Sequence, residues 1–178
     1  FAARFQNRQR ARKNNRLEPR FNFGGRKFFN RSPDEFFNAM LIKQHDRLFD
    51  LRIPKALKVV YVWGKGLSLF ANKKFKRGEK IIYLKGKLVS AANSTPEAVQ
   101  MSDNKFIDTK YLVPEDFINH SCSPNAKLDT GKRWFIAIKD ISKNEEVTFN
   151  YLTTEWDMKK WGTDFKCACG SNNCFGHI

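Results

Sequence analysis

Asp116-Phe-Ile-Asn-His-Ser-Cys-Ser-Pro-Asn125 is the segment from which the fold of this 178-residue chain can be inferred. Its apolar pair, Phe117 and Ile118, predicts the end of a buried strand. The small polar residues after the pair predict a turn, because Asn and Ser side chains hydrogen-bond to nearby backbone groups. Cys122 lies in this turn, whereas the other three cysteines fall within residues 167–178. Any account of the cysteines must therefore connect the turn to the C-terminal segment.

Four cysteines are the full ligand set of a tetrahedral structural zinc site. They are Cys122, Cys167, Cys169 and Cys174, and the last three form a Cys-x-Cys-x4-Cys pattern. A disulfide is less favoured, because one residue between Cys167 and Cys169 is a poor spacing for a bond between them. Zinc is therefore the preferred interpretation. Free buried thiols, and His177 as a substitute ligand, stay open as alternatives.

The net charge of +15 is concentrated at the start of the chain. Residues 1–31 hold ten Lys or Arg and a single acid, Glu18, while the other residues hold 23 bases and 17 acids. Phenylalanines alternate with these arginines, a combination suited to phosphate contact and base stacking, so nucleic acid is the predicted partner, with RNA favoured over DNA. The alternative is a solvated tail that keeps the protein soluble. An Arg-rich, acid-poor start predicts a mitochondrial or nuclear location, with the mitochondrion slightly favoured.

The apolar pattern predicts a mostly β chain. Ser32-Pro-Asp-Glu35 begins a helix that we expect to end near Asp50. From Leu57 onward short runs of β-branched and aromatic residues alternate with turn residues, which indicates many short strands with non-local pairing. We expect strands over residues 59–63, 67–71, 80–84, 87–89, 106–108, 111–113, 134–138 and 146–151, a loop or short helix over 90–104 and a short helix over 154–161. No apolar run reaches the roughly 20 residues of a membrane helix, so no membrane partner is expected.

Five stretches together resemble the SET-domain protein-lysine methyltransferases. They are Trp63-Gly-Lys-Gly-Leu67, Tyr83-Leu-Lys-Gly86, Asn119-His-Ser-Cys-Ser-Pro-Asn125, Glu145-Glu-Val-Thr-Phe-Asn-Tyr151 and Phe165-Lys-Cys-Ala-Cys-Gly170, the last followed by Cys174 and Gly176. They occur in the family's order and cover roughly residues 57–178. The central motif together with the cysteine tail is the most specific part of the resemblance.

This resemblance implies a SET-domain fold of small twisted sheets with a pseudo-knotted C-terminal segment. The chain would divide into a basic Arg/Phe-rich extension (1–31), an N-terminal helix and linker (32–56), a SET domain (57–161) and a post-SET zinc-binding tail (162–178). It implies S-adenosylmethionine as methyl donor and a protein lysine side chain as acceptor. It also implies that Cys122, Cys167, Cys169 and Cys174 share one structural zinc ion.

The resemblance further implies which residues hold the cofactor. The backbone around Lys65 and Gly66 would approach its methionine part, where a bulky turn would clash. Asn119 and His120 would supply hydrogen bonds, His120 largely through its backbone near the adenine, so that its ring is not a general base. Tyr151 would contact the cofactor as well.

Two tyrosines are the implied catalytic residues. Tyr151 would aim its hydroxyl at the transfer site, and Tyr83 would line the lysine channel and orient the amine. Lysine must lose its proton before it can attack, and a low-dielectric channel beside a positive sulfonium lowers the pKa of the amine. Alignment of the two reacting groups then supplies most of the acceleration.

Several positions depart from the family pattern. Asp116 replaces an Arg, Asn144 a Gly, Asn150 an Asp and Lys87 a Glu, and the usual Gly-Asn pair before Phe117 is missing. Together these changes favour an alternative: a catalytically idle or weak SET-like subunit of a nucleoprotein particle, such as a mitochondrial ribosome or its assembly intermediate, bound through the basic arm.

Overall fold

A computed structural model describes residues 52–62, 65–94, 98–109, 113–155, 158–159 and 164–178. The basic arm (1–31) and the helix expected over 32–50 lie outside the described residues. The described part consists of four small sheets and three short 3-10 helices, with no long helix among these residues. The prediction of a mostly β chain is therefore confirmed for the part of the chain that the structure describes.

The first sheet is a hairpin that a later segment joins. Strand β1 (Leu57–Val62) pairs antiparallel with β2 (Gly66–Ala71), as their β-branched and aliphatic residues predict. The backbone N–H of Ala71 donates to the carbonyl of Glu145 at 2.9 Å, and that of Val147 donates to the carbonyl of Leu69 at 2.8 Å. These bonds place Glu146 beside β2, although it lies some eighty residues further along the chain.

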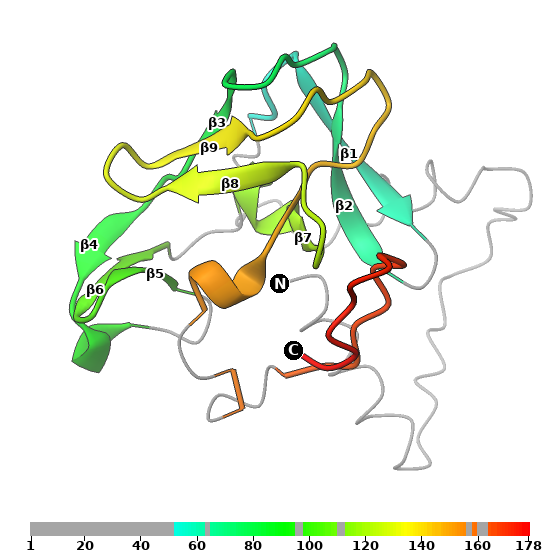
Figure 1. The fold of residues 1–178 in the computed structure, drawn as a ribbon. Coiled ribbons are helices and arrows are strands. Elements are labelled where there is room, and N and C mark those ends of the chain that lie inside the picture. Colours follow the sequence, from blue (N-terminus) through cyan, green and yellow to red (C-terminus); the bar gives the residue numbers. More distant parts are fainter. Residues whose placement is uncertain (1–51, 63–64, 95–97, 110–112, 156–157, 160–163) are drawn as a thin grey trace, which may run out of the picture.

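Two of the other sheets are three-stranded and antiparallel (Figure 1). One has the order β3 (Lys80–Tyr83), β9 (Trp134–Ala137), β8 (Ala126–Asp129), and the other the order β4 (Lys87–Val89), β6 (Lys105–Asp108), β5 (Val99–Ser102). Both β5 and β8 contradict the sequence prediction, which placed a loop or short helix over 90–104 and no strand between Asn125 and Trp134. Only a 3-10 helix, η1 (Ala91–Asn93), and β5 occupy the described part of that loop, because pairing with β6 outweighs its polar composition.

The central motif has a different local structure from the one predicted. Phe117 ends a 3-10 helix, η2 (Pro114–Phe117), and not a strand, although both Phe117 and Ile118 are fully buried as expected. The side chain of Asp116 accepts a hydrogen bond from the backbone N–H of Val113 at 2.9 Å and so stabilises the start of this turn. Val113 therefore precedes a helix, and residues 111–112 of the strand expected there lie outside the described residues.

A two-stranded parallel sheet joins the central motif to the last motif. Strand β7 (Asn119–His120) pairs with β10 (Thr148–Phe149), with His120 opposite Phe149. The strand expected over 146–151 is thus shorter, and its end forms a third 3-10 helix, η3 (Tyr151–Thr153). Thr154 closes η3 instead of starting a helix, and half of the residues expected in that helix, 154–161, lie outside the described residues. The parallel pairing brings Asn119, His120 and Tyr151 into one small region.

The C-terminal tail is a closed loop that lies against this region. Backbone hydrogen bonds join Phe165 and Ile178 in both directions, at 2.9 and 3.0 Å, and Lys166 pairs with His177. The tail, drawn in red in Figure 1, contacts the turn after β7, because the backbone N–H of Phe175 lies 3.5 Å from the sulfur of Cys122. No helix among the described residues is long and apolar enough to cross a bilayer.

Candidate active site and metal centre

Tyr151 lies at the centre of the residues that the sequence predicts to be functional. It begins η3 and is only 5% exposed. Its hydroxyl donates to the carbonyl oxygen of Ile118 at 2.9 Å, and its ring packs against Phe149 and, edge-on, against His120. The direction of the hydroxyl is therefore fixed by backbone that immediately precedes the central motif.

A polar network on β2 and β7 orients Asn119. The side-chain amide of Asn119 donates to the hydroxyl of Ser68 at 2.7 Å and to the carboxylate of Glu146 at 2.8 Å. Because a carboxylate only accepts hydrogen bonds, the amide nitrogen must face Glu146, and the amide oxygen must point the other way. The second oxygen of Glu146 accepts from the ammonium group of Lys65 at 2.7 Å.

The ring of His120 lies between Tyr151 and the cysteines. Its Nδ1 atom accepts from the backbone N–H of Tyr151 at 3.1 Å, and its Nε2 atom lies 3.2 Å from the Sγ atom of Cys122. Burial lowers the pKa of His120 below its ordinary value, which favours the neutral ring. Phe165 from the tail packs edge-on against the same ring. The structure therefore gives the His120 side chain two partners, in addition to the backbone role expected from the sequence.

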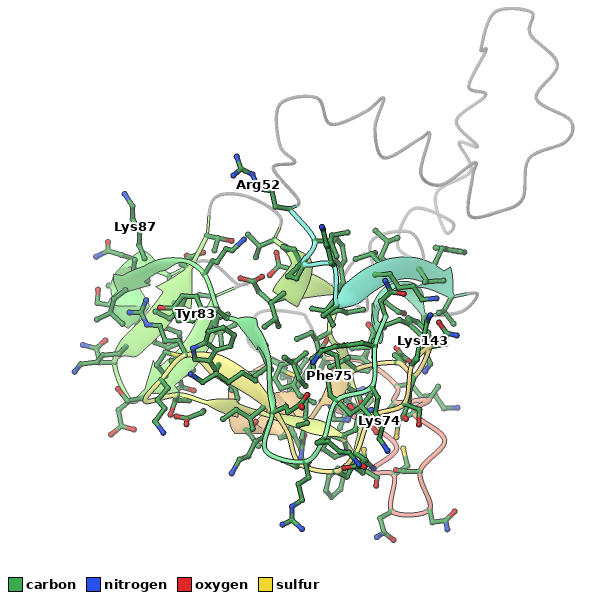
Figure 2. All side chains as sticks on the ribbon, turned by 90° about the horizontal axis from the view of Figure 1, so that it is seen from above. Arg52, Lys74, Phe75, Tyr83, Lys87 and Lys143 are labelled. Atoms are coloured by element: carbon green, nitrogen blue, oxygen red, sulfur yellow. The ribbon has the colours of Figure 1, made fainter. Side chains whose placement is uncertain are left out.

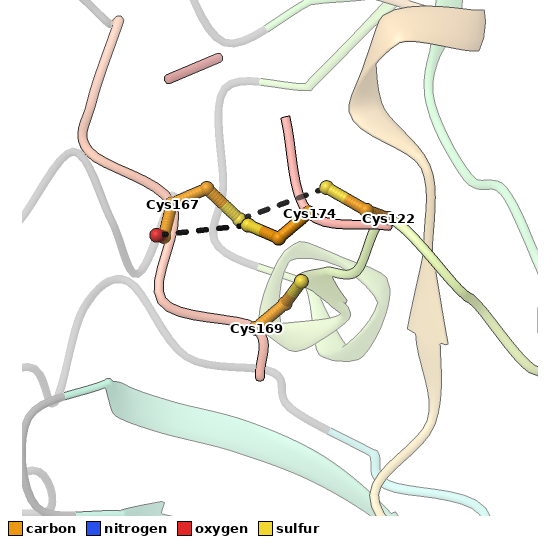
Figure 3. Close-up of side chains that lie close together, drawn as sticks. All are labelled: Cys122, Cys167, Cys169 and Cys174. Atoms are coloured by element: carbon orange, nitrogen blue, oxygen red, sulfur yellow. Dashed lines mark hydrogen bonds between the residues drawn. The ribbon is translucent and has the colours of Figure 1, made fainter. Parts of the chain in front are cut away.

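The four cysteines form one cluster (Figure 3). Cys122 comes from the turn after β7 and the other three from the tail, and all four Sγ atoms lie within 4.8 Å of one another. All four are free thiols, which argues against the disulfide alternative. The Sγ atoms of Cys122 and Cys167 are 3.8 Å apart, which is about the separation that two ligands at the usual zinc–sulfur distance of about 2.3 Å have in a tetrahedron. The donor set and its spacing fit a zinc ion.

The surroundings of the thiols shift their ionisation in opposite directions. The backbone N–H of Phe175 points at the sulfur of Cys122, and that of Gly176 points at the sulfur of Cys174. Burial raises the pKa of Cys167 to about 12. Burial also opposes ionisation of Cys169, but hydrogen bonds, with that of Ser171 the largest, lower its pKa to about 5. Ionisation thus differs between Cys167 and Cys169, and a divalent cation is the partner that would hold both as thiolates.

His177 is not part of this cluster. Its ring faces Asp164, with Nε2 3.6 Å from the carboxylate, and the residue is largely exposed. The alternative in which His177 replaces a cysteine ligand is therefore not supported. Phe165 and Ile178 carry the hydrogen bonds that close the tail around the cysteines.

The remaining predicted residues lie in two places. Gly66 begins β2 with a φ of +88°, a conformation that favours glycine, directly after Lys65 closes a turn on the carbonyl of Val62. Tyr83 ends β3, is 38% exposed, and packs edge-on against Trp134 with ring centroids 5.5 Å apart. In Figure 2, Tyr83 lies nearer the middle of the molecule than Lys87 does. Glu146 thus links Lys65 to Asn119, and a hydrogen bond links His120 to Tyr151, whereas the ring contact of Tyr83 is with Trp134.

Sequence reasoning missed three residues that hold this site together. Ser68 is fully buried in β2, and a polar residue inside an apolar strand is a signal that a buried partner exists. Glu146 is a charged residue directly before the apolar Val147, so its side chain had to find a polar neighbour. Phe165 precedes the tail cysteines, and no local pattern distinguishes it from an ordinary core residue.

Comparison with known proteins gives a consistent result. The family described as "SET domain" matches residues 66–152. Among curated proteins, the methyltransferase flvH of Aspergillus flavus is 42% identical over 64 residues, which are 35% of this chain and 34% of that protein. An H3 lysine-4 specific histone-lysine N-methyltransferase of Aspergillus oryzae is 39% identical over 87 residues, 44% of this chain and 7% of that protein.

A longer match is the H3 lysine-36 specific histone-lysine N-methyltransferase of Cryptococcus neoformans, which is 29% identical over 155 residues, 75% of this chain and 18% of that protein. The chain thus spans about a third or less of the length of these relatives. A crystal structure of KRYPTONITE with mCHH DNA, an H3(1-15) peptide and SAH has a TM-score of 0.55 at 22% identity, over 68% of this chain and 29% of that one. A second, with mCHG DNA and SAH, has a TM-score of 0.57 at 22% identity, over 71% of this chain and 29% of that one. These likenesses support the same fold.

Proposed function

We propose that this chain transfers a methyl group from S-adenosylmethionine to a lysine side chain of a protein. The reason is that it belongs to the SET-domain family of protein-lysine methyltransferases. The observation that carries this proposal is the buried Tyr151 hydroxyl, held on the carbonyl of Ile118 directly before Asn119 and His120. A tyrosine with one fixed direction is what an in-line transfer requires, because alignment of the reacting groups provides most of the acceleration.

The residues of the site fit the cofactor. With the amide nitrogen of Asn119 committed to Ser68 and Glu146, its amide oxygen is turned to accept a hydrogen bond from a donor such as an α-ammonium group. The turn at Gly66 brings backbone close to the same region without a side chain. S-adenosylmethionine, when bound, supplies an electrophilic methyl group on a positively charged sulfur.

The chain's own residues prepare the acceptor amine. Tyr151, Phe149 and Phe165 surround the site with aromatic rings, and an apolar wall lowers the pKa of a lysine that enters it. The neutral amine that results is the nucleophile. Tyr151 orients it, and we retain Tyr83, which is 38% exposed at the C-terminal end of β3, as the second tyrosine of the lysine channel.

Zinc is the proposed structural ion. The four cysteines would hold it, and its role would be to fasten the tail to the turn after β7. This places Phe165 against Tyr151 and His120. A tail of so few apolar residues has little core of its own, so its position depends on this attachment.

The substrate is proposed only as a protein lysine. The relatives named above are specific for different lysines of H3, while the SET-domain match over residues 66–152 includes the turn, β7 and Tyr151. We infer that the shared segment carries the transfer chemistry and that other segments select the substrate.

The test is calorimetric titration of S-adenosylmethionine into the zinc-loaded full chain and its Tyr151→Phe variant, followed by mass spectrometry of lysine peptides. We expect both proteins to bind with affinities within about threefold of each other, because the removed hydroxyl bonds to Ile118 and the oriented Asn119 remains. Methyl transfer by the variant should fall by about a hundredfold or more, as loss of an aligned catalytic group does. A folded, zinc-loaded chain that binds no cofactor would rule the proposal out.

A second candidate function rests on the basic arm. Residues 1–31 carry ten bases and one acid, and a SET-like subunit without activity would use this arm to bind RNA in a nucleoprotein particle. Binding of RNA that weakens steeply with salt and is lost on removal of residues 1–31, together with absent cofactor binding, would favour this function over methyl transfer.

A further inference from the structure

We propose that the His120 side chain is a positioning residue that couples the cysteine cluster to Tyr151, by donating a hydrogen bond to the Cys122 thiolate while accepting one from the Tyr151 backbone. The inference rests on the proposed function only for its kinetic consequence. The hydrogen bonds themselves are independent of any methyl transfer.

The partners of the ring determine where its proton lies. The backbone N–H of Tyr151 is 3.1 Å from Nδ1 and is a donor only, so Nδ1 must be the unprotonated acceptor. A neutral imidazole then carries its single proton on Nε2, the nitrogen that lies 3.2 Å from the sulfur of Cys122. The ring is therefore held in one tautomer, and Nε2 is the donor to the sulfur.

The hydrogen bond that Nε2 of His120 donates orients the thiolate of Cys122. A hydrogen bond to a thiolate stabilises the charge and fixes the direction of its lone pairs, and partners that orient a metal ligand in this way affect metal affinity. Cys122 receives a second such bond from the backbone N–H of Phe175 in the tail. The cysteine from the turn is therefore oriented from both sides, once by the site and once by the tail.

The hydrogen bond that Nδ1 of His120 accepts holds the backbone of Tyr151 in place. This residue begins η3, where backbone N–H groups lack partners within the helix. Nδ1 of His120 satisfies the first of them, and the two rings also pack edge-on with centroids 5.4 Å apart. Since the hydroxyl of Tyr151 is tied to Ile118, the backbone and the hydroxyl of this tyrosine are both held by residues 118–120.

Two substitutions separate the two bonds, because an Asn amide reaches the position of Nδ1 and a Gln amide reaches that of Nε2. His120→Asn can still accept from Tyr151 but has no donor near Cys122. His120→Gln can still donate to Cys122 but has no acceptor near the Tyr151 backbone. Ser123→Ala, at an exposed position of the same turn, is the matched control.

The experiment uses the zinc-loaded full chain and three measurements. Long-range ¹H–¹⁵N spectra of the imidazole report the tautomer, transfer of zinc to a chelating dye reports the metal release rate, and hydrogen exchange reports protection of the Tyr151 amide. We expect an unprotonated Nδ1 and a protonated Nε2. His120→Asn should release zinc about ten to a hundred times faster with an unchanged amide, and His120→Gln should release zinc within about threefold of the wild type with an amide that exchanges at least tenfold faster.

Other results would overturn the proposal. These are a protonated Nδ1, equal zinc release by the Asn and Gln variants, or a control that releases zinc as fast as His120→Asn. Where transfer is measurable, His120→Gln should lower kcat more than His120→Asn, with KM for the lysine peptide little changed. A wild-type chain with no transfer at all would contradict the proposed function, while the tautomer and the release rates would still decide the inference about His120.

Discussion

Replacing Glu146 by Gln tests whether the polar network or the ion pair holds the site together. One oxygen of Glu146 accepts from Asn119 at 2.8 Å and the other from Lys65 at 2.7 Å. A Gln side chain keeps the shape but has one NH2 group in place of an oxygen. Whichever way the amide turns, it presents a donor to a donor, so one of the two bonds must be lost.

The two bonds differ in their surroundings. The side chain of Glu146 is 15% exposed and that of Lys65 is 41% exposed, so the ion pair is screened by water and contributes about 0–1 kcal/mol. Asn119 is buried, and its hydrogen bond to a charged group contributes about 1.5–3 kcal/mol. Because the Gln amide also removes the charge from the bond that remains, we expect the free energy of unfolding of Glu146→Gln to fall by about 2 kcal/mol. For a chain of this size that lowers the Tm by about 4–8 °C.

The assay is urea denaturation of the zinc-loaded chain, with Lys65→Gln as the matched control. This control removes the exposed ion pair alone and should change the free energy of unfolding by no more than about 1 kcal/mol. Since Glu146 also fixes the direction of the Asn119 amide, Glu146→Gln should weaken S-adenosylmethionine binding about tenfold, which corresponds to about 1.4 kcal/mol. If Lys65→Gln destabilises the chain as much as Glu146→Gln, the ranking of the two bonds is wrong.

Three further predictions concern stability. Gly86→Ala should lower the free energy of unfolding, measured by urea denaturation, by about 2–4 kcal/mol, because its φ is +134° and a Cβ atom there would lie 2.6 Å from Ile107. The control is Gly78→Ala, where φ is also positive but nothing lies within 4 Å of the added Cβ atom. Its free energy of unfolding should fall by only about 1 kcal/mol. Burial raises the pKa of Glu115, whose Oε2 atom has no hydrogen-bond partner. Its ionisation therefore opposes folding as the pH rises above the value of about 4.3 at which an exposed glutamate ionises. Glu115→Gln should be more stable than the wild type at pH 8 but not at pH 4, and equal differences at both pH values would refute this. Removal of zinc by a chelator should expose residues 164–178 to proteolysis while residues 65–94 stay protected, and mass spectrometry of the fragments would show a different pattern if the tail held itself in place.

The parts of the fold that the sequence predicted are those with a strong local pattern. The β1–β2 hairpin and strand β6 follow from β-branched and aliphatic residues. The cysteine cluster follows from the number of cysteines, because four thiols are a full ligand set for zinc. Strands β5 and β8 were missed because their residues are polar or small and become strands through their partners. The turn η2 was missed because Phe117 is as buried as a strand residue, and burial alone does not distinguish the two.

The sequence predicted the residues of the candidate site but not the contacts that join them. Asn119, His120 and Tyr151 were expected to act together, and the parallel pairing of β7 with β10 explains how residues thirty positions apart meet. The roles of Ser68 and Glu146 depend on a backbone link between β2 and the segment after Asn144, which no short motif contains. Pairings over such distances are set by the global packing, and a single sequence carries no local signal for them.

The departures from the family pattern leave the local structure of the motifs intact. Asn144 has a φ of +68°, a conformation that Asn tolerates better than most residues, so the turn that glycine usually makes is preserved. Asn150 accepts a hydrogen bond from the backbone N–H of Leu152 and caps η3, as an aspartate would. Asp116 stabilises η2 through Val113. Three of the four substituted residues therefore make a local contact or adopt a backbone conformation that holds the motif in place. Cofactor binding by the zinc-loaded chain is accordingly the property by which the enzymatic and the structural interpretations differ most.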